Sequence, residues 1–397
     1  MNKIYDIIII GAGAAGLFAA ANLKGKKTLI IEKNKEAGIK LLMSGAGRCN
    51  ITNSCDIKGF LSKYNNEKFM RKILYAYTNK DLLAFFEKRG IEFYTDKNGK
   101  VFPKSDKAVD IRNLLVKEAK ENRVKFSYNT KVISVEKNEN FIVKTNKETF
   151  ETKKLVIAAG GKSYPTSGSD GDGYTLAKVL GHEIVDVRPA LTPITVHDYV
   201  YSDFSGLAIQ NSKVIIYREN KKVKEYVNDV LFTHKGLSGP GILNISSYMK
   251  KGDVIKFSML KYNNEETFRN YFNEKVEEYS NLKVKNFVKK LGIYEKIADK
   301  LFNIDKKVSE LSKKEKNNII SKILFFELEI SKVEGYNVAM VTAGGVKLDQ
   351  IDNKTMQSKI VNNLYFLGEV IDIDAKTGGY NLQACFSEAM IFTRQGA

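Results

Sequence analysis

A glycine-rich turn between an apolar strand and a helix of small residues constrains this chain more than any other feature. Residues 4–10 are an apolar run that leads into Gly11-Ala12-Gly13-Ala14-Ala15-Gly16, and Glu32 follows a second apolar run. In such a strand–turn–helix–strand unit, the first glycine permits the turn, the second lets a pyrophosphate approach, and the third lets the helix pack closely. Helix N–H groups then hold phosphates, while Glu32 accepts ribose hydroxyls. The unit predicts an α/β dinucleotide-binding fold, in preference to a glycine turn without a ligand.

Length and cysteine usage narrow the class of protein. A chain of 397 residues is expected to hold two or three domains. It has no apolar run of membrane-spanning length, so we expect a cytoplasmic protein with no membrane partner. Cys49, Cys55 and Cys385 form no CxxC pair and no metal-like cluster with the histidines. The sequence therefore predicts no metal site and argues against a dithiol redox relay.

The net charge of +18 lies almost entirely in two stretches. Residues 58–154 carry 23 basic and 13 acidic residues, and residues 283–322 carry 12 and 5. Such concentrations suit a phosphate backbone or an anionic substrate. Only 9 of the 64 basic residues are arginine, however, which is typical of a lysine-rich composition without function. RNA contact and compositional bias both stay open, and the second is favoured.

A polar, glycine-rich loop follows Glu32. It offers backbone donors, hydroxyls, amides and one arginine, which suit a pyrophosphate or the polar edge of a flavin. The cofactor contacts we expect here, together with Lys33, are Lys40, Leu41, Ser44, Gly45, Arg48, Cys49, Asn50, Thr52 and Asn53. For Cys49, packing as a small residue is favoured over thiol chemistry at the flavin.

The later segments alternate between strand and helix patterns. Residues 66–123 have helical spacing, and residues 124–127, 132–135 and 141–143 predict a small antiparallel meander that includes the expected cofactor contact Val132. Residues 190–260 are β-rich, and residues 265–330 are Lys-rich with a helical pattern. The change in composition near residue 190 predicts an inserted domain.

Two further segments are expected to return to the cofactor. A buried strand ends in Ala158-Ala159-Gly160-Gly161, where the chain passes beside the dinucleotide, and Asp172 is expected to cap the helix that follows. Near the other end, a strand over residues 365–369 precedes Asp374 and a helix N-terminus. That terminus suits the electron-rich N1/O2 edge of a flavin, and Asp374 suits a ribityl hydroxyl. The contacts expected here are Gly344, Gly368, Glu369, Asp374, Gly379, Tyr380, Asn381, Leu382 and Gln383.

Four blocks of sequence carry a resemblance to a known family. They are residues 40–53, residues 158–173, Phe232-Thr233-His234-Lys235-Gly236-Leu237-Ser238-Gly239-Pro240, and residues 342–346 through 378–383. In these blocks the chain resembles the FAD-dependent flavoproteins that include aminoacetone oxidase-like enzymes and a bile-acid ene-reductase. Glu388 stands where a small polar residue is usual in that family.

The resemblance implies an α/β fold with a glutathione-reductase-like Rossmann FAD domain. The implied boundaries are residues 1–190 and 335–397 for the discontinuous FAD-binding domain, 191–262 for an inserted β-barrel-like domain, and 263–334 for a Lys-rich helical subdomain. The insertion is expected to form a lid over the cofactor.

The resemblance also implies a class of reaction, in which hydride moves between flavin N5 and a substrate carbon. Activities associated with the family are amine oxidation, reduction of conjugated C=C bonds, and reduction of uridine in ribosomal RNA to dihydrouridine. We expect an FAD-dependent oxidoreductase that acts on a small organic substrate with NAD(P)H or O₂ as partner. The alternative is an RNA-modifying flavoenzyme.

The catalytic groups are less sharply indicated than the cofactor site. Tyr164 precedes Pro165 and offers a phenol to a substrate oxygen, with packing against the flavin as an equal alternative. His234 lies in a Gly/Ser/Pro-rich loop, where a proton donor is one role and hydrogen bonding within the loop is the favoured one. The chain has no second GxGxxG unit, so any NAD(P)H is expected to dock at the flavin itself.

Overall fold

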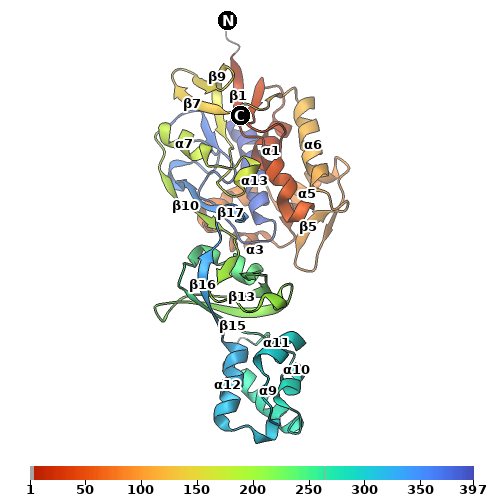
Figure 1. Cartoon of the computed structure of the whole chain (residues 1–397). Helices are drawn as coiled ribbons and strands as arrows, with labels where there is room; N and C mark the ends of the chain where they lie inside the picture. The colour runs from red at the N-terminus through yellow and green to blue at the C-terminus, as the bar shows by residue number, and fades with distance from the viewer. Residues whose placement is uncertain (1–3, 263) are drawn as a thin grey trace. The chain divides into compact units, whose positions relative to one another are not determined.

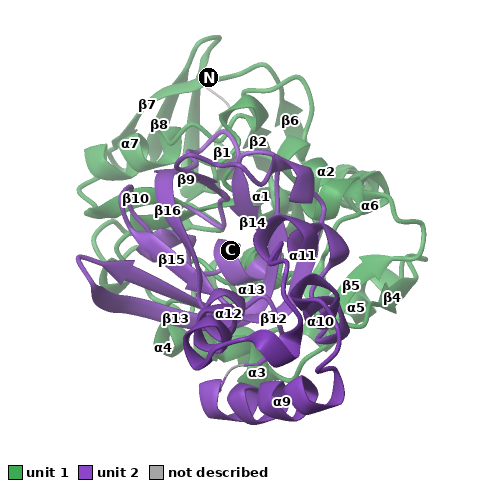
Figure 2. Cartoon of the chain, turned by 60° about the horizontal axis from the view of Figure 1, so that its bottom comes forward, with its two compact units in different colours: residues 1–189, 339–397 green, residues 190–338 purple. Residues whose placement is uncertain are grey.

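The computed structural model describes residues 4–262 and 264–397, and it divides them into two compact units. Unit 1 comprises residues 1–189 and 339–397, and unit 2 comprises residues 190–338 (Figure 2). Residues 1–3 of the predicted FAD domain and residue 263 of the predicted helical subdomain lie outside the described residues. The predicted boundary between residues 262 and 263 falls inside unit 2 and stays a prediction.

A seven-stranded sheet forms the centre of unit 1 (Figure 1). Its parallel strands are β6 (Lys125–Ser127), β2 (Thr28–Ile31), β1 (Tyr5–Ile10), β9 (Thr149–Ile157) and β18 (Leu364–Phe366). The isoleucines of β1 are buried because a central parallel strand is covered on both faces. Strands β8 (Phe141–Thr145) and β7 (Val132–Lys137) extend the sheet antiparallel to β9.

Our assignment of residues 124–127 to the meander is wrong. Strand β6 pairs parallel with β2, through Ile30 opposite Phe126, at the edge of the main sheet. Its short alternating pattern is compatible with either pairing, and only the tertiary fold selects the parallel one.

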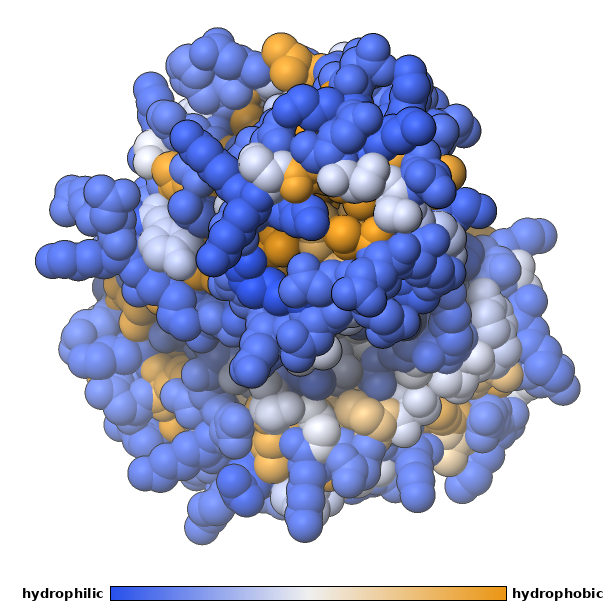
Figure 3. Space-filling view, turned by 90° about the horizontal axis from the view of Figure 1, so that it is seen from below, coloured by the Kyte–Doolittle hydropathy of each residue, from blue (hydrophilic) through white to orange (hydrophobic). Residues whose placement is uncertain are grey.

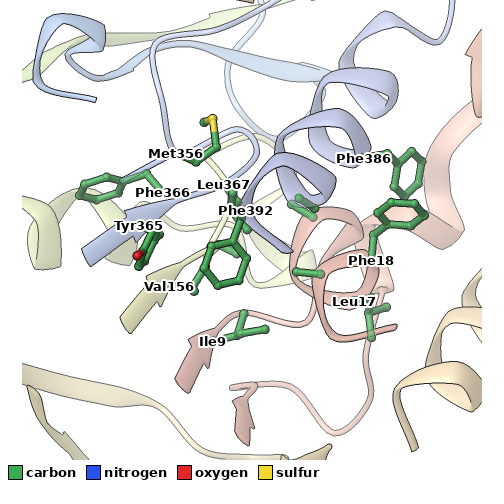
Figure 4. Close-up of a cluster of buried hydrophobic side chains, with 14 of the residues drawn as sticks. Ile9, Leu17, Phe18, Val156, Met356, Tyr365, Phe366, Leu367, Phe386 and Phe392 are labelled. Atoms are coloured by element: carbon green, nitrogen blue, oxygen red, sulfur yellow. The ribbon is translucent and has the colours of Figure 1, made fainter. Parts of the chain in front are cut away.

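Helices of small and apolar residues cover the sheet. Helix α1 (Ala14–Asn22) packs against α6 (Ala108–Glu121) and α13 (Tyr380–Ile391). Phe18 and Phe386 meet at a centroid distance of 4.9 Å, and Ile9 and Val156 lie on neighbouring strands of the same core (Figure 4). The remaining helices of unit 1 are α2 (Ile39–Met43), α3 (Ile57–Leu61), α4 (Glu67–Ala76), α5 (Asn79–Glu87) and α7 (Asp172–Val179).

The helical prediction for residues 66–123 misses a hairpin. Strands β4 (Phe93–Thr95) and β5 (Lys100–Pro103) pair with each other, and β5 also pairs with β3 (Thr52–Asn53). Asp96 Oδ1 accepts hydrogen bonds from the amides of Asn98 and Lys100, while Gly99 has φ +78°. This Asx-type turn closes the hairpin. A separate two-stranded sheet joins β10 (Ile184–Ala190) to β17 (Val341–Val346).

Unit 2 contains a closed six-stranded barrel. In barrel order its strands are β11 (Ile194–Val196), β14 (Gly236–Ser238), β13 (Lys221–Phe232), β12 (Ala208–Arg218), β15 (Val254–Phe257) and β16 (Phe326–Val333). The helices are α8 (Pro240–Leu243), α9 (Glu265–Glu278), α10 (Val284–Lys290), α11 (Glu295–Leu301) and α12 (Lys313–Leu324). Phe257 of the barrel and Phe268 and Phe287 of the helices belong to one buried apolar cluster.

The helical prediction for residues 265–330 is wrong at its end, because β16 begins at Phe326 and completes the barrel. Phe326, Leu328 and Ile330 are buried while Glu327 and Glu329 are exposed, which is the two-residue period of a strand. Among the described residues, no helix is both long enough and apolar enough to cross a bilayer.

Candidate cofactor site

The glycine turn at the end of β1 has the shape that a pyrophosphate requires. Gly11 has φ +102°, and a Cβ atom there would lie 2.5 Å from Ala158 O. A Cβ atom on Gly16 would lie 2.1 Å from Gly11 O, whereas one on Gly13 would meet open space. Helix α1 has no side-chain cap, and its first hydrogen bond is donated by Leu17 N to Gly13 O. The amides of Ala14, Ala15 and Gly16 are therefore available to phosphate oxygens, and the turn fits a dinucleotide.

Glu32 is buried beside this turn. Its Oε2 accepts a hydrogen bond of 2.8 Å from Ala12 N, and its Oε1 accepts bonds of 2.9 Å from the backbone and side-chain nitrogens of Asn34. These bonds fix the carboxylate at the end of β2. Oε2 accepts only one bond and keeps acceptor capacity for the ribose hydroxyl that the sequence predicts as its partner.

The adjoining charges are paired with the loop that follows β9. Lys33 Nζ lies 2.6 Å from Asp170 and 3.1 Å from Asp172, and Lys131, next to Val132, lies 3.1 Å from Asp172. Asp172 makes no cap bond, because it is the first residue of α7 and its carboxylate is held by these lysines. The expectation that Asp172 caps the helix is wrong for this reason. Ala159 and Gly160 lie in the same loop, and a Cβ on Gly160 would contact Ser169 Oγ at 2.9 Å.

The loop after β2 is bonded to the N-terminus of α13. Thr52 Oγ1 donates to Gln383 Oε1 (2.6 Å), and Asn53 Nδ2 donates to Gly378 O (3.1 Å). With its amide oriented to satisfy both atoms, Asn50 accepts from Gly379 N at 3.0 Å. Segments from the two halves of the sequence thus lie together, as we predicted for the cofactor site.

Other members of the predicted loop are held by local contacts. Ser44 Oγ donates to Leu41 O (2.6 Å), Gly45 has φ +58°, and the Arg48 guanidinium stacks over the Phe102 ring at 4.5 Å. Cys49 is fully buried, and that burial raises the pKa of its thiol to about 12. A neutral, buried thiol agrees with the packing role that the sequence favours.

The N-terminus of α13 has no side-chain cap. Asn381 turns back and bonds both the amide and the carbonyl of Ala375 at 2.9 Å, while Tyr380 packs edge-on against Phe60. Leu382 is half-buried in the same turn. An uncapped helix N-terminus at this place fits the flavin edge proposed from the sequence.

Asp374 lies in the loop that leads to α13. Its carboxylate forms no hydrogen bond or ion pair with the described residues. Burial, followed by the charge of Asp372, raises its pKa to about 6, and Arg188 opposes that rise. It is an acceptor with capacity for a hydroxyl.

A polar network that sequence reasoning missed joins three segments of unit 1. Lys40 Nζ lies 2.6 Å from Ser163 Oγ and forms an ion pair with Glu369. Glu369 Oε1 accepts bonds of 2.7 Å from Ser163 Oγ and Thr342 N. Ser163 and Thr342 were not among the predicted residues. They lie just after Gly161 and just before Gly344, within two of the blocks that carry the family resemblance, and that position is the signal that could have indicated them.

Two of the glycines predicted to contact the cofactor are buried, and they have structural roles. A Cβ on Gly344 would lie 2.3 Å from Asp186 O in the neighbouring strand β10. Gly368 N donates a hydrogen bond to Glu388 Oε2 (2.6 Å), and this bond anchors the turn before Glu369.

The two catalytic candidates belong to different units. Tyr164, in unit 1, has the left-handed φ of +52° and follows Ser163 directly. Such strain in a non-glycine residue is concentrated at functional sites. His234 is exposed in the loop between β13 and β14 of unit 2. Their roles stay predictions. Within residues 4–262 and 264–397, no group of acidic, His or Cys side chains could hold a metal ion.

The fold, the glycine turn and the buried acid define a Rossmann-type flavoprotein. The chain belongs to the HI0933-like family, because the model described as the HI0933-like protein Rossmann domain matches residues 5–395. It is an FAD-dependent oxidoreductase. The expected fold class and the wider family of FAD-dependent flavoproteins are thereby confirmed, while the aminoacetone oxidase-like or ene-reductase-like subfamily stays a prediction.

Relatives that match nearly the whole chain bear names of two kinds. One, from Escherichia coli (strain K12), is named ribosomal RNA dihydrouridine synthase and is 35% identical over 97% of this chain and 96% of its own. Another, from Clostridium scindens, is named 3-dehydro-bile acid delta(4,6)-reductase and is 28% identical over 100% and 99%. Among solved structures, a 3-ketosteroid-delta4-(5alpha)-dehydrogenase from Rhodococcus jostii covers 99% of this chain and 95% of its own. Its TM-score is 0.52 at 12% identity, which is likeness of fold alone.

Proposed function

We propose that this enzyme reduces the C5=C6 bond of uridine in ribosomal RNA to dihydrouridine, with FAD as cofactor and a reduced nicotinamide as electron donor. The observation that carries the proposal is the full-length similarity to the Escherichia coli protein of that name, at 35% identity. A Haemophilus influenzae protein of the same name is 32% identical over 98% of both chains. Dihydrouridine formation in ribosomal RNA is the second of the two functions predicted from the sequence.

The chemistry of uracil specifies what the protein must provide. The flavin, when bound, supplies hydride to the electron-poor C6, negative charge then develops on the C4 carbonyl oxygen, and C5 needs a proton. The protein has to hold the base, stabilise that oxygen and supply the proton. Burial raises the pKa of Cys49 and Cys385, which makes both thiols weak proton donors at neutral pH. Tyr164 and His234 are the donors we propose.

The surface charge supports an RNA substrate. Lysines in residues 283–322 fall into two groups. Those in ion pairs with acidic side chains are Lys283, Lys285, Lys289, Lys300 and Lys306. Those that form no ion pair within the described part of the chain are Lys290, Lys296, Lys307, Lys313, Lys314, Lys316 and Lys322. The second group has its charge free for phosphates. Figure 3 shows a face on which hydrophilic side chains predominate.

The test uses the purified FAD-loaded enzyme without oxygen. The flavin is reduced with NADPH or NADH and then mixed with protein-free ribosomal RNA, and both flavin reoxidation and dihydrouridine formation are measured. Rapid reoxidation with an equal yield of dihydrouridine is expected. Reoxidation that leaves the RNA unchanged would overturn the proposal.

A small conjugated ketone is the second candidate substrate. It is supported by the relative named as a bile-acid reductase, which matches the entire chain. A steroid enone in the same experiment separates the candidates: reoxidation by the enone with inert RNA would establish the small-molecule reaction instead.

A further inference from the structure

The Lys40 ammonium is a fixed cation with an unused hydrogen-bond donor. We propose that it faces the bound flavin and raises the flavin's reduction potential, with Glu369, Ser163 and Thr342 as positioning residues. The inference rests on the use of FAD and does not depend on which substrate is reduced.

A count of donors and acceptors supports this role. Of the three N–H groups of Lys40, one is directed to Ser163 Oγ (2.6 Å) and one to Glu369 Oε2. The third has no acceptor among the described residues, and the side chain is 24% exposed. A lysine with two anchors and one open donor is suited to hold an acceptor that comes from outside the chain.

The surroundings prevent the ammonium from moving away. Ser163 and Thr342 are fully buried. Thr342 Oγ1 accepts bonds from Lys162 N (2.8 Å) and Ser163 N (3.1 Å), which fixes the loop after β9 against β17. A Cβ atom on Gly161 would lie 2.5 Å from Thr342 Oγ1 and 2.8 Å from Glu369 Oε1. Gly161 is thus the residue that lets the network close, and the cation is preorganised.

The same contacts place Lys40 at the cofactor. Lys40 lies in α2, which leads into the segment bonded to α13 through Thr52. Glu369 follows β18, and Ser163 follows the small residues that come after β9. These are the three segments in which flavin contacts are expected from the sequence. Reduction adds negative charge to the flavin, and a nearby cation favours the more negative form. Glu369 partly offsets that cation, so the two side chains act on the potential in opposite directions.

The experiment measures the midpoint potential of bound FAD, without any substrate, by anaerobic equilibration with a reference dye. Lys40→Met should shift the potential to more negative values and lower the fraction of flavin reduced by a fixed excess of NADPH. Lys40→Arg should stay near the wild-type value because it keeps the charge. The matched control is Lys58→Met, which removes an exposed lysine of α3 and should change nothing.

Glu369→Gln provides an independent measurement, in which the expected shift of the midpoint potential has the opposite sign. Removing the negative partner should shift the potential to more positive values, and this measurement remains available where Lys40→Met fails to retain FAD. An unchanged potential in an FAD-loaded Lys40 variant, or shifts of the same sign in both variants, would overturn the proposal. An unchanged potential with slow reoxidation would instead make Lys40 a proton donor. Failure of the RNA proposal would leave all these potentials unaffected.

Discussion

Thr52 Oγ1 donates a hydrogen bond of 2.6 Å to Gln383 Oε1, and both residues are completely buried. The bond joins the loop after β2 to α13 across 331 positions of sequence. The Gln383 amide also donates to Ser387 Oγ at 3.0 Å, so its oxygen and its nitrogen are both engaged. The end of the predicted cofactor loop, at Thr52, is therefore part of the core of unit 1.

Thr52→Val should destabilise the protein, because valine keeps the shape but leaves the Gln383 oxygen without its donor. We expect the free energy of unfolding to fall by about 1–3 kcal/mol. Urea denaturation of the FAD-loaded protein measures this loss. Thr149→Val, at an exposed site in β9, is the control and should have little effect. Equal stabilities for the two variants would contradict the importance of the bond.

Glu32→Ala should weaken FAD retention, because the variant loses an acceptor for the ribose and releases the Ala12 amide. A lost charge-assisted bond is worth about 1.5–3 kcal/mol, or roughly a tenfold to hundredfold rise in the dissociation constant. Fluorescence titration of the apoprotein with FAD gives that constant. Glu36→Ala removes a nearby carboxylate that pairs with Arg112 instead, and it should bind FAD as the wild type does.

The affinity for FAD should depend on pH through Asp374. Its pKa is raised to about 6, so the carboxylate is mostly protonated at pH 5 and mostly ionised at pH 7. An ionised carboxylate accepts the stronger hydrogen bond from a ribityl hydroxyl. We therefore expect FAD to bind more tightly as the pH rises from 5 to 7, and Asp374→Asn to reduce that dependence. An identical pH profile for both proteins would mean that Asp374 does not contact the cofactor.

Glu388 should make the protein less stable as the pH rises. Burial raises its pKa from 4.5 to about 8, so between these values the folded state holds a proton that the unfolded state has released. Stability is then lost with increasing pH by at most about 1.4 kcal/mol per pH unit. Glu388→Gln should gain stability relative to the wild type from pH 5 to pH 7. Unfolding curves at each pH test this, with the exposed Glu139→Gln as control.

Removing the unpaired lysines of α12 should weaken RNA binding more than removing paired ones. The triple change Lys313→Gln, Lys314→Gln and Lys316→Gln is compared with Lys283→Gln, Lys285→Gln and Lys289→Gln, whose ammonium groups face acidic partners. Because each neutralised phosphate contributes to the salt dependence, the first set should flatten the plot of log affinity against log salt more. Equal slopes would assign these lysines to compositional bias.

The sequence was most informative where local chemistry dictates conformation. The turn at Gly11 and the position of Glu32 follow from steric and hydrogen-bonding needs that lie within one βαβ unit. Strand β16 and the β4–β5 hairpin were missed because short apolar runs do not distinguish strand from helix. In each case a pairing with a distant strand decides the conformation.

The Lys40 network lay beyond sequence reasoning for a related reason. Lys40, Ser163, Thr342 and Glu369 are far apart along the chain, and although the first three lie in blocks that carry the family resemblance, no spacing relates them to one another. Lys40 and Glu369 were expected to contact the cofactor, but their mutual ion pair follows only from the tertiary fold. Glu388, likewise, shows its elevated pKa only once its burial is known.

Helix α13 is among the last elements of unit 1 to be synthesised, yet Thr52 and Asn53 depend on it. During translation the glycine turn is made before unit 2, and its distant partners in α13 are made after unit 2. Because we propose that residues 378–383 contact FAD, we expect stable capture of the cofactor only after these residues are made. Until then the apolar faces of β1 and α1 lack their full set of contacts and need protection from solvent. The supply of FAD should therefore affect the last step of folding rather than the early steps.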